Sequence, residues 1–345
     1  MHHGRLIAIS DVHLDTWRDS ADKRQAFLDF LSWVRSESGC GHFAIVGDLL
    51  DVPQVDHAPV MSRYRDLFTH IGSVMRAGVT VHWIVGNHDA GLVGLDVSMT
   101  QPPLQIAYPG ALVDLGDSSV WLEHGHVLDA WLWAFLQYHA ARLGAVDPAQ
   151  AMAHFGTCGV GDPAPFPASE FVHRTLYDAM QWRSLETGFA DDEKRLGIHV
   201  MSQHLDDDFA EVAGDGEKPL HKAEIQARLE QYGLTVSDLK AGVELPEEAL
   251  DLFFLIGRFY YSKLPWRRAA RCKLAQLRQQ HGNKLRGLIM GHIHDVDLSS
   301  WNGGGDTLTY ANCGTWGHDD GSFIVVENGE MTAVRRRWDD PLPKL

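Results

Sequence analysis

The sequence predicts an α/β fold, and three observations support this prediction. Short apolar runs at residues 5–10, 43–46 and 81–85 have the length of buried strands. The segments between them carry apolar residues at helical spacing: Phe27, Phe30, Leu31 and Val34 in one, and Tyr64, Leu67, Phe68 and Ile71 in the other. Each apolar run also ends directly in a polar, motif-like segment. Because strands that alternate with helices form βαβ units, we expect a mostly parallel sheet.

Strand character continues later in the chain. Further apolar runs are residues 120–123, 288–290, 307–311, 323–326 and 332–336. Asn328-Gly329 joins the last two, and this dipeptide is a strong hairpin-turn signal. From His126 to Gly291 the pattern becomes helical, with few β-branched runs. We therefore expect a core of residues 1–128 and 286–345 that carries a helical insertion at 129–285.

The balance of charged residues argues against nucleic acid as a binding partner. The chain has 30 Lys and Arg against 46 Asp and Glu, so its formal net charge is −16. Proteins that coat nucleic acid neutralise phosphates with basic side chains, and this composition argues against such a surface. We expect no nucleic-acid partner.

The cysteine pattern and the hydropathy of the chain indicate a reducing compartment without a membrane span. Cys40, Cys158, Cys272 and Cys313 are widely separated, which is typical of free thiols in a reducing environment. The N-terminal residues lack the pattern of a signal peptide, and no apolar stretch approaches the roughly 18 residues of a membrane span. A soluble cytoplasmic protein is the expectation.

Five short motifs combine carboxylate, imidazole and amide side chains. In order they are Asp11-x-His13, Gly47-Asp48-x-x-Asp51, Gly86-Asn87-His88-Asp89, His124-Gly125-His126 and Gly291-His292-x-His294. One such motif alone is a weak signal. All five follow predicted strands, and ligands in open α/β sheets bind beyond the carboxyl ends of the strands.

These residue types suit divalent metal ions. Carboxylates and imidazoles bind Mn, Fe or Zn, whereas a thiolate-rich set would indicate structural zinc. Two cations held close together need a bridging anion, and Asp48 is the candidate for that role. The predicted ligands are Asp11, His13, Asp48, Asn87, His124, His292 and His294.

The motifs resemble those of the calcineurin-like metallophosphoesterase family over residues 5–126 and 286–337. The resemblance implies a four-layer α/β/β/α sandwich and two divalent ions, with Mn as the first candidate and Fe or Zn as alternatives. It implies that Asp11, His13 and His294 bind one ion, that Asn87, His124 and His292 bind the other, and that Asp48 bridges them.

The same resemblance implies catalytic roles. His88 would contact the scissile phosphate and protonate the leaving oxygen. Asp51 and Asp89 would orient the ligands or His88. The nucleophile would be a metal-bound hydroxide, so that no Ser or Cys nucleophile is needed.

The substrate is less closely restricted. His124-Gly-x-x-Leu128, the final Gly-His-x-His and a helical insertion between them resemble the UDP-2,3-diacylglucosamine hydrolases of lipid A synthesis. This implies a small phosphorylated substrate, with a lipid-linked or nucleotide-sugar pyrophosphate first among the candidates. A protein phosphatase, a cyclic-nucleotide phosphodiesterase and a non-catalytic metal-binding scaffold are the alternatives.

The insertion contains two aromatic-rich segments, residues 131–138 and 252–261, and the second runs into the basic residues of 258–278. Two interpretations stay open. The aromatic residues form the insertion's own core, or they form a lid that holds an acyl chain or contacts the inner face of an anionic membrane.

Overall fold

The computed structural model describes most of the chain. The described residues are 4–14, 21–36, 39–50, 65–88, 104–132, 134–135, 138, 189–205, 222–316, 320–338 and 340–343. The chain divides into two compact units. We call residues 1–126 with 274–345 the core unit, and residues 127–273 the helical unit.

The first sheet of the core unit has the strand order β11-β10-β1-β2-β3-β4. The strands are β1 (Leu6–Ile9), β2 (His42–Val46), β3 (Thr80–Ile84), β4 (Gln105–Ala107), β10 (Asp320–Glu327) and β11 (Glu330–Arg337). The four strands β1 to β4 are parallel, and β10 runs antiparallel to both β1 and β11. Asn328 and Gly329 between β10 and β11 have φ of 52° and 79°, as the predicted tight hairpin turn requires.

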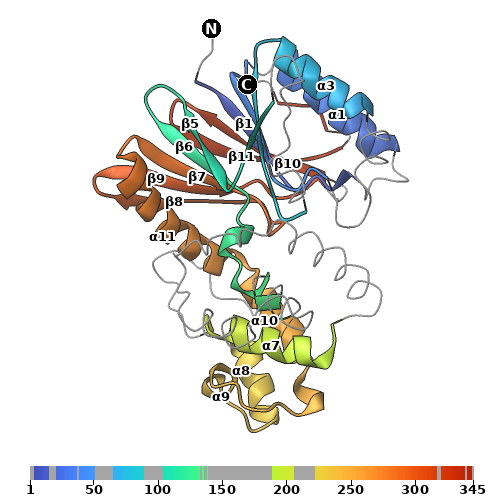
Figure 1. Cartoon of the computed structure of the whole chain (residues 1–345), viewed down its shortest axis with the longest axis vertical. Helices are drawn as coiled ribbons and strands as arrows, with labels where there is room; N and C mark the ends of the chain where they lie inside the picture. Colours follow the sequence, from blue (N-terminus) through green and yellow to red (C-terminus); the bar gives the residue numbers. More distant parts are fainter. Residues whose placement is uncertain are drawn as a thin grey trace. The chain divides into compact units, whose positions relative to one another are not determined.

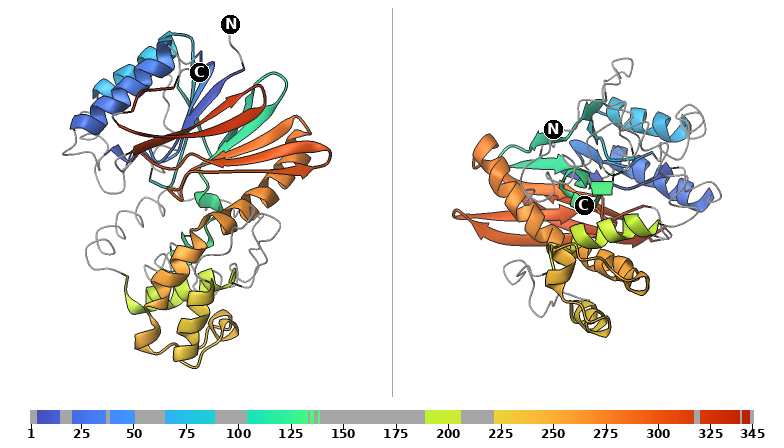
Figure 2. Two further views of the ribbon diagram at one scale, coloured as in Figure 1. Left: turned by 180° about the vertical axis from the view of Figure 1, so that it is seen from behind. Right: turned by 60° about the horizontal axis from the view of Figure 1, so that its bottom comes forward.

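The second sheet has the order β5-β6-β7-β9-β8. Its strands are β5 (Gly110–Asp114), β6 (Ser119–Glu123), β7 (Leu285–Met290), β8 (Asp297–Gly303) and β9 (Asp306–Asn312). The strands β6, β7 and β9 are parallel, whereas β5 and β8 are antiparallel edge strands. Figures 1 and 2 show the two sheets side by side in the core unit.

Alternation along the strands builds the layers. Leu6 and Ala8 face the second sheet and pack there with residues such as Leu122 and Ile289. Ile7 and Ile9 face the opposite way, into a core shared with the helices α1 (Ala21–Ser36) and α3 (Arg65–Arg76). Both helices lie along the outer face of the first sheet in Figure 1.

Part of the helix α11 (Lys263–His281) covers the outer face of the second sheet. The His281 ring stacks on Trp121 of β6 at 5.2 Å, and Leu274 and Leu277 are buried. The arrangement is the predicted α/β/β/α sandwich.

The expectation of a mostly parallel sheet was only partly right, because both sheets are mixed. The strands β4, β5 and β8 were not predicted. β4 has only three residues, and β8 carries polar residues with alternating burial, as edge strands often do. The strands β4 and β8 therefore lack the apolar run that marks a buried strand.

The helical unit comprises the described helices α7 (Asp191–Ser202), α8 (Lys222–Gln231), α9 (Val236–Lys240), α10 (Leu252–Tyr260) and the start of α11, with short 3-10 turns at His126–Leu128 and Glu247–Ala249. Phe253, Ile256, Phe259 and Tyr260 of α10 are buried in its core, which also contains Trp131. For most of these aromatic residues the core interpretation is therefore right. Among the described residues, no helix is long and apolar enough to cross a membrane.

Candidate metal centre

Five of the predicted ligands have an unusual backbone conformation. Asp11, His13, Asp48, His292 and His294 have φ of 52°, 47°, 53°, 77° and 58°. This left-handed region costs a non-glycine residue about 1–2 kcal/mol. Among the described non-glycine residues only Asn328, in a hairpin turn, shares it. Backbone strain of this kind persists only where the surrounding structure stabilises it. The five residues all lie in the loops that follow β1, β2 and β7.

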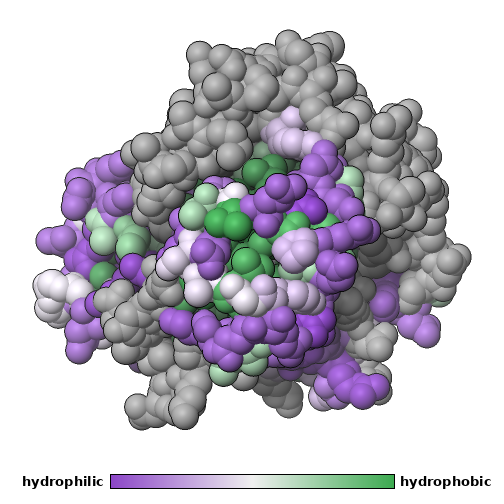
Figure 3. All heavy atoms as spheres, turned by 90° about the horizontal axis from the view of Figure 1, so that it is seen from below, coloured by the Kyte–Doolittle hydropathy of each residue, from purple (hydrophilic) through white to green (hydrophobic). Residues whose placement is uncertain are grey.

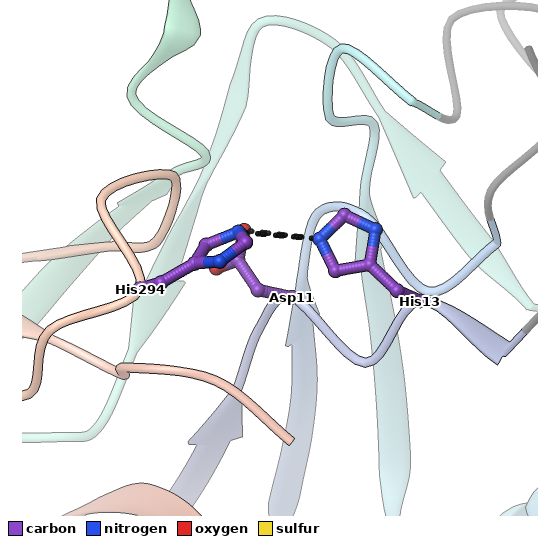
Figure 4. A group of neighbouring side chains, drawn as sticks. All are labelled: Asp11, His13 and His294. Carbon is purple, nitrogen blue, oxygen red and sulfur yellow. Dashed lines mark hydrogen bonds and ion pairs between the residues drawn. The ribbon is translucent and has the colours of Figure 1, made fainter. Parts of the chain in front are cut away.

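Asp11, His13 and His294 form the first group of candidate ligands. Asp11 Oδ1 lies 3.1 Å from His294 Nε2 and 3.9 Å from His13 Nε2. The two imidazole Nε2 atoms are 3.2 Å apart. Figure 4 shows the three side chains pointing toward one another, from the loop after β1 and the loop after β7.

Asn87, His124 and His292 form the second group. Asn87 Oδ1 lies 3.0 Å from His124 Nε2 and 3.1 Å from His292 Nδ1. His124 Nδ1 is 2.8 Å from the Val46 carbonyl, which can only accept, so Nδ1 carries a proton. In the neutral imidazole, the Nε2 lone pair is then directed into the site, as a metal ligand requires.

Asp48 lies between the two groups. Its Oδ2 is 3.0 Å from His124 Nε2, and its Oδ1 accepts a hydrogen bond of 2.8 Å from the backbone N–H of His88. The Asp48 carboxylate also clusters with His13 and His88 in one set of potential ligands and with Asp11 and His124 in another. This central position is the one that a bridging carboxylate needs.

His88 lies at the edge of the first group. Its ring meets the His13 ring edge-on, with 4.9 Å between the centroids. His88 is half-buried and can reach both solvent and the site. Asp51 and Asp89, the predicted orienting carboxylates, lie outside the described residues.

Three glycines make room for ligands of other motifs. A Cβ at Gly47 would lie 2.2 Å from His124 Nδ1, and a Cβ at Gly86 would lie 2.1 Å from Asp48 Oδ1. A Cβ at Gly291 would lie 2.6 Å from Asp11 Oδ2. Each glycine directly precedes a predicted ligand. The loops therefore pack closely against one another. The motifs contain these glycines because a side chain at each position would clash with a ligand from another motif, which the spacing of the motifs does not reveal.

The side chains perturb one another's pKa values. Burial disfavours the charged form of Asp11, but His294 and His124 outweigh it and lower the pKa of Asp11 to about 2. Burial also opposes charge on His124, yet Asp48 and Asp11 outweigh it and raise the pKa of His124 to about 10. Burial, reinforced by His88, lowers the pKa of His13 to about 4. Without metal, a His124 imidazolium thus offsets the buried carboxylates.

The residues present fit a pair of divalent cations. Asp11 Oδ1 is buried, and none of the surrounding nitrogens meets it with hydrogen-bond geometry, although His124 Nε2 also lies 4.0 Å away. Imidazole nitrogens that converge on a buried carboxylate oxygen are satisfied by a cation between them. The donor set of carboxylate, imidazole and amide oxygen suits Mn, Fe or Zn.

A protein-family model matches the N-terminal part of the chain. Residues 4–170 match the model of the calcineurin-like phosphoesterases, just under half of the 345 residues. Over this segment the chain is similar to the calcineurin-like phosphoesterases. The match supports a phosphoester hydrolase, and the structure contains candidate Asp and His ligand groups for metal. His292 and His294 lie beyond the segment that the family model covers.

Other comparisons add no argument. No curated protein sequence matches the chain. A phosphoesterase-like protein of Streptococcus pneumoniae, described as a predicted phosphoesterase, is 9% identical, with 97% of this chain and 90% of that chain covered and a TM-score of 0.30. A cold-active protein-tyrosine phosphatase of a psychrophilic Shewanella species is 14% identical, with 97% and 80% covered and a TM-score of 0.33. Scores of this size support no transfer of substrate.

Proposed function

We propose that this domain hydrolyses phosphate esters with two divalent cations, Mn²⁺ being the first candidate and Fe or Zn the alternatives. Asp11, His13 and His294 would hold one cation, Asn87, His124 and His292 would hold the other, and Asp48 would contribute to both sites. The observation that carries the proposal is the position of the Asp48 carboxylate, 3.0 Å from His124 and within one cluster with His13 and His88. When bound, the cations would polarise the phosphoryl oxygens and favour ionisation of a water nucleophile.

The chain's own groups supply position and protons. The hydrogen bond that His124 Nδ1 donates to the Val46 carbonyl orients that imidazole, and the backbone N–H of His88 fixes the Asp48 carboxylate. His88, half-buried beside His13, would contact the phosphate and give a proton to the leaving oxygen. Asp51 and Asp89 remain predicted orienting residues.

The test combines metal analysis with one substitution. Wild type and Asp48→Asn are stripped of metal, reloaded with Mn²⁺ and assayed on a generic aryl phosphate ester. We expect wild type to hold two ions and Asp48→Asn to lose metal and at least 100-fold in activity. Asp114→Asn is the matched control, because this exposed carboxylate has Lys284 and the Gly116 N–H as partners and no candidate ligand among them. Metal-free wild type, or equal activity in wild type and Asp48→Asn, would refute the proposal.

A second proposal concerns the substrate. The helical unit contains a hollow of about 490 Å³ whose walls include Leu196, Leu239, Val243 and Leu245. Val243 is 45% exposed and Phe254 is 59% exposed. Figure 3, a view from below, shows described apolar side chains (green) gathered together and ringed by hydrophilic ones (purple). These features favour a small phosphorylated substrate with an acyl group over a protein phosphatase substrate, and they also suit peripheral contact with a membrane.

Paired substrates test this choice. Wild type and Val243→Asp are assayed on an acylated nucleotide-sugar pyrophosphate and on the same compound without acyl chains. We expect Val243→Asp to raise the KM for the acylated compound alone. Equal KM changes for both substrates, or none, would count against acyl recognition by the helical unit.

A further inference from the structure

The side chain of Asn312 connects two of the ligand-bearing loops. Asn312 is the last residue of β9 and is fully buried. The parallel register of β7 and β9 places it beside Met290, so that it adjoins the Gly291-His292 peptide. Its Nδ2 donates a hydrogen bond of 2.6 Å to the Gly291 carbonyl, and its Oδ1 accepts one of 3.0 Å from the Gly314 N–H.

The Gly291-His292 segment is itself a junction of the site. Gly291 N–H donates to the His124 carbonyl at 3.0 Å, and His292 N–H donates to Asp11 Oδ2 at 3.0 Å. The position of this peptide therefore affects ligands from three motifs. The remaining polar atom of Gly291, its carbonyl oxygen, accepts the hydrogen bond from the Asn312 amide and a second one, at 3.0 Å, from the Ile293 N–H.

The other end of the connection reaches Asp11. The turn at residues 313–316 begins at Asn312, and the carbonyl of Asp11 accepts hydrogen bonds from Thr315 Oγ1 at 2.8 Å and from the Trp316 N–H at 3.1 Å. A buried chain thus runs from Gly291 through the amide of Asn312 and the turn to the backbone of Asp11. An amide is required at its centre, because one end must donate to a carbonyl while the other accepts from an N–H.

We propose that Asn312 is a positioning residue for the metal centre: its amide sets the distance between Asp11 and the His292/His294 loop and thereby the affinity for metal. This inference rests on the proposed function, since it concerns the cations of that site. Residues that orient metal ligands through hydrogen bonds commonly change metal affinity by about 10- to 100-fold when substituted.

Metal titration of the metal-free protein tests the inference without any assay of activity. We expect Asn312→Ala and Asn312→Asp to bind Mn²⁺ about 10- to 100-fold more weakly than wild type by calorimetry. Asn312→Asp keeps the acceptor for Gly314 and loses the Nδ2 donor, which bonds the Gly291 carbonyl at 2.6 Å and the Tyr310 hydroxyl at 3.4 Å. The curve of activity against Mn²⁺ should shift to higher concentration by the same factor, with kcat at saturating Mn²⁺ within a few-fold of wild type.

Two further variants separate positioning from general damage. Ser322 Oγ donates to the Cys313 carbonyl at 2.6 Å and to the Thr315 carbonyl at 3.4 Å in the same turn, and neither acceptor belongs to Asp11 or Gly291. Ser322→Ala should lower the thermal midpoint and leave the Mn²⁺ affinity unchanged. Thr315→Val, which removes the hydroxyl bond to Asp11, should weaken Mn²⁺ binding, whereas Thr315→Ser should restore it. This pair tests the connection even where the Asn312 variants fold poorly.

The outcomes are distinct. Wild-type Mn²⁺ affinity in folded Asn312→Asp and in Thr315→Val overturns the positioning role. An equal loss of affinity in Ser322→Ala also overturns it, because the turn would then matter only as a whole. If wild type binds two ions but hydrolyses no phosphate ester, the proposed function fails while the Asn312 comparison still stands on the binding data.

Discussion

Gly86 faces the carboxylate of Asp48 so closely that the position admits no side chain. A Cβ at residue 86 would lie 2.1 Å from Asp48 Oδ1 and 2.6 Å from the Asp48 backbone N. The loop after β3 can therefore place Asn87 and His88 beside Asp48 only because residue 86 is a glycine.

Gly86→Ala tests this contact. We expect the added methyl to displace Asp48, to weaken metal binding by at least tenfold and to lower activity by at least 100-fold. Gly72→Ala is the control, since its Cβ would meet only the flexible end of Arg76, at 3.4 Å, within α3. Glycine to alanine in a helix stabilises by about 1 kcal/mol, so the control should retain activity and gain slightly in thermal midpoint. A fully active Gly86→Ala would show that the loop has more freedom than the contact implies.

Metal binding should release protons. The pKa of His124 is raised to about 10 in the metal-free site, where Asp48 and Asp11 outweigh burial, and the pKa of His294 is raised through Asp11. A ligand imidazole must be neutral, so metal replaces these protons and its affinity rises with pH up to the pKa of His124. Calorimetry at pH 7.5 in buffers of different ionisation enthalpy should show release of about one to two protons. Binding without proton release would mean that His124 is not a ligand.

Acid should destabilise the metal-free core unit through His82. Burial, reinforced by the charge of His42, lowers the pKa of His82 to about 4. The unfolded chain, with an ordinary pKa of about 6.5, then binds more protons, so unfolding free energy falls as the pH drops from about 6.5 to 4. His82 therefore changes the free energy of unfolding by on the order of 3 kcal/mol, and this stability is fully present above pH 6.5.

Urea unfolding of wild type and His82→Phe at pH 7 and pH 5 measures this contribution. The variant should lose less stability than wild type between the two pH values. His13, whose pKa is also lowered to about 4, accounts for a residual slope. If wild type and His82→Phe lost the same unfolding free energy between pH 7 and pH 5, His82 would not be a cause of the acid destabilisation.

Two neighbouring phenylalanines distinguish core from surface in the helical unit. Phe253 is 6% exposed and packs against Trp131 and Phe189, with ring centroids at 5.6 Å and 4.9 Å. Phe253→Ala should cost about 3–5 kcal/mol of stability, whereas Phe254→Ala, at a site 59% exposed, should stay within about 0.5 kcal/mol. Thermal unfolding provides the comparison. Similar losses for both would show that Phe254 is also part of a packed core.

The motifs allowed a candidate site to be inferred from local sequence, whereas the apolar pattern could not show how the strands pair. Each ligand motif is local in sequence and follows a strand, so its position beyond a strand end could be inferred. The pairing of β10 with β1 joins residues some 320 positions apart, such as Leu6 and Val326, and no local pattern encodes such a partner. Mixed sheets were therefore missed, although most of their strands were recognised.

The residues that hold the ligand loops in place could not be predicted from the sequence, for a related reason. Asn312 and Thr315 lie in a segment that reads as a structural turn, and their importance depends on which backbone atoms they face. Gly47, Gly86 and Gly291 were visible in the motifs, but the side chain that each accommodates comes from another motif. Such relationships exist only after the loops have been brought together.

Anomalous diffraction from crystals grown with Mn²⁺ tests the two-metal centre most directly. The account predicts two peaks roughly 3.5–4 Å apart, one beside Asp11, His13 and His294 and one beside Asn87, His124 and His292, with Asp48 between them. The absence of a peak at these residues under saturating Mn²⁺ would contradict it.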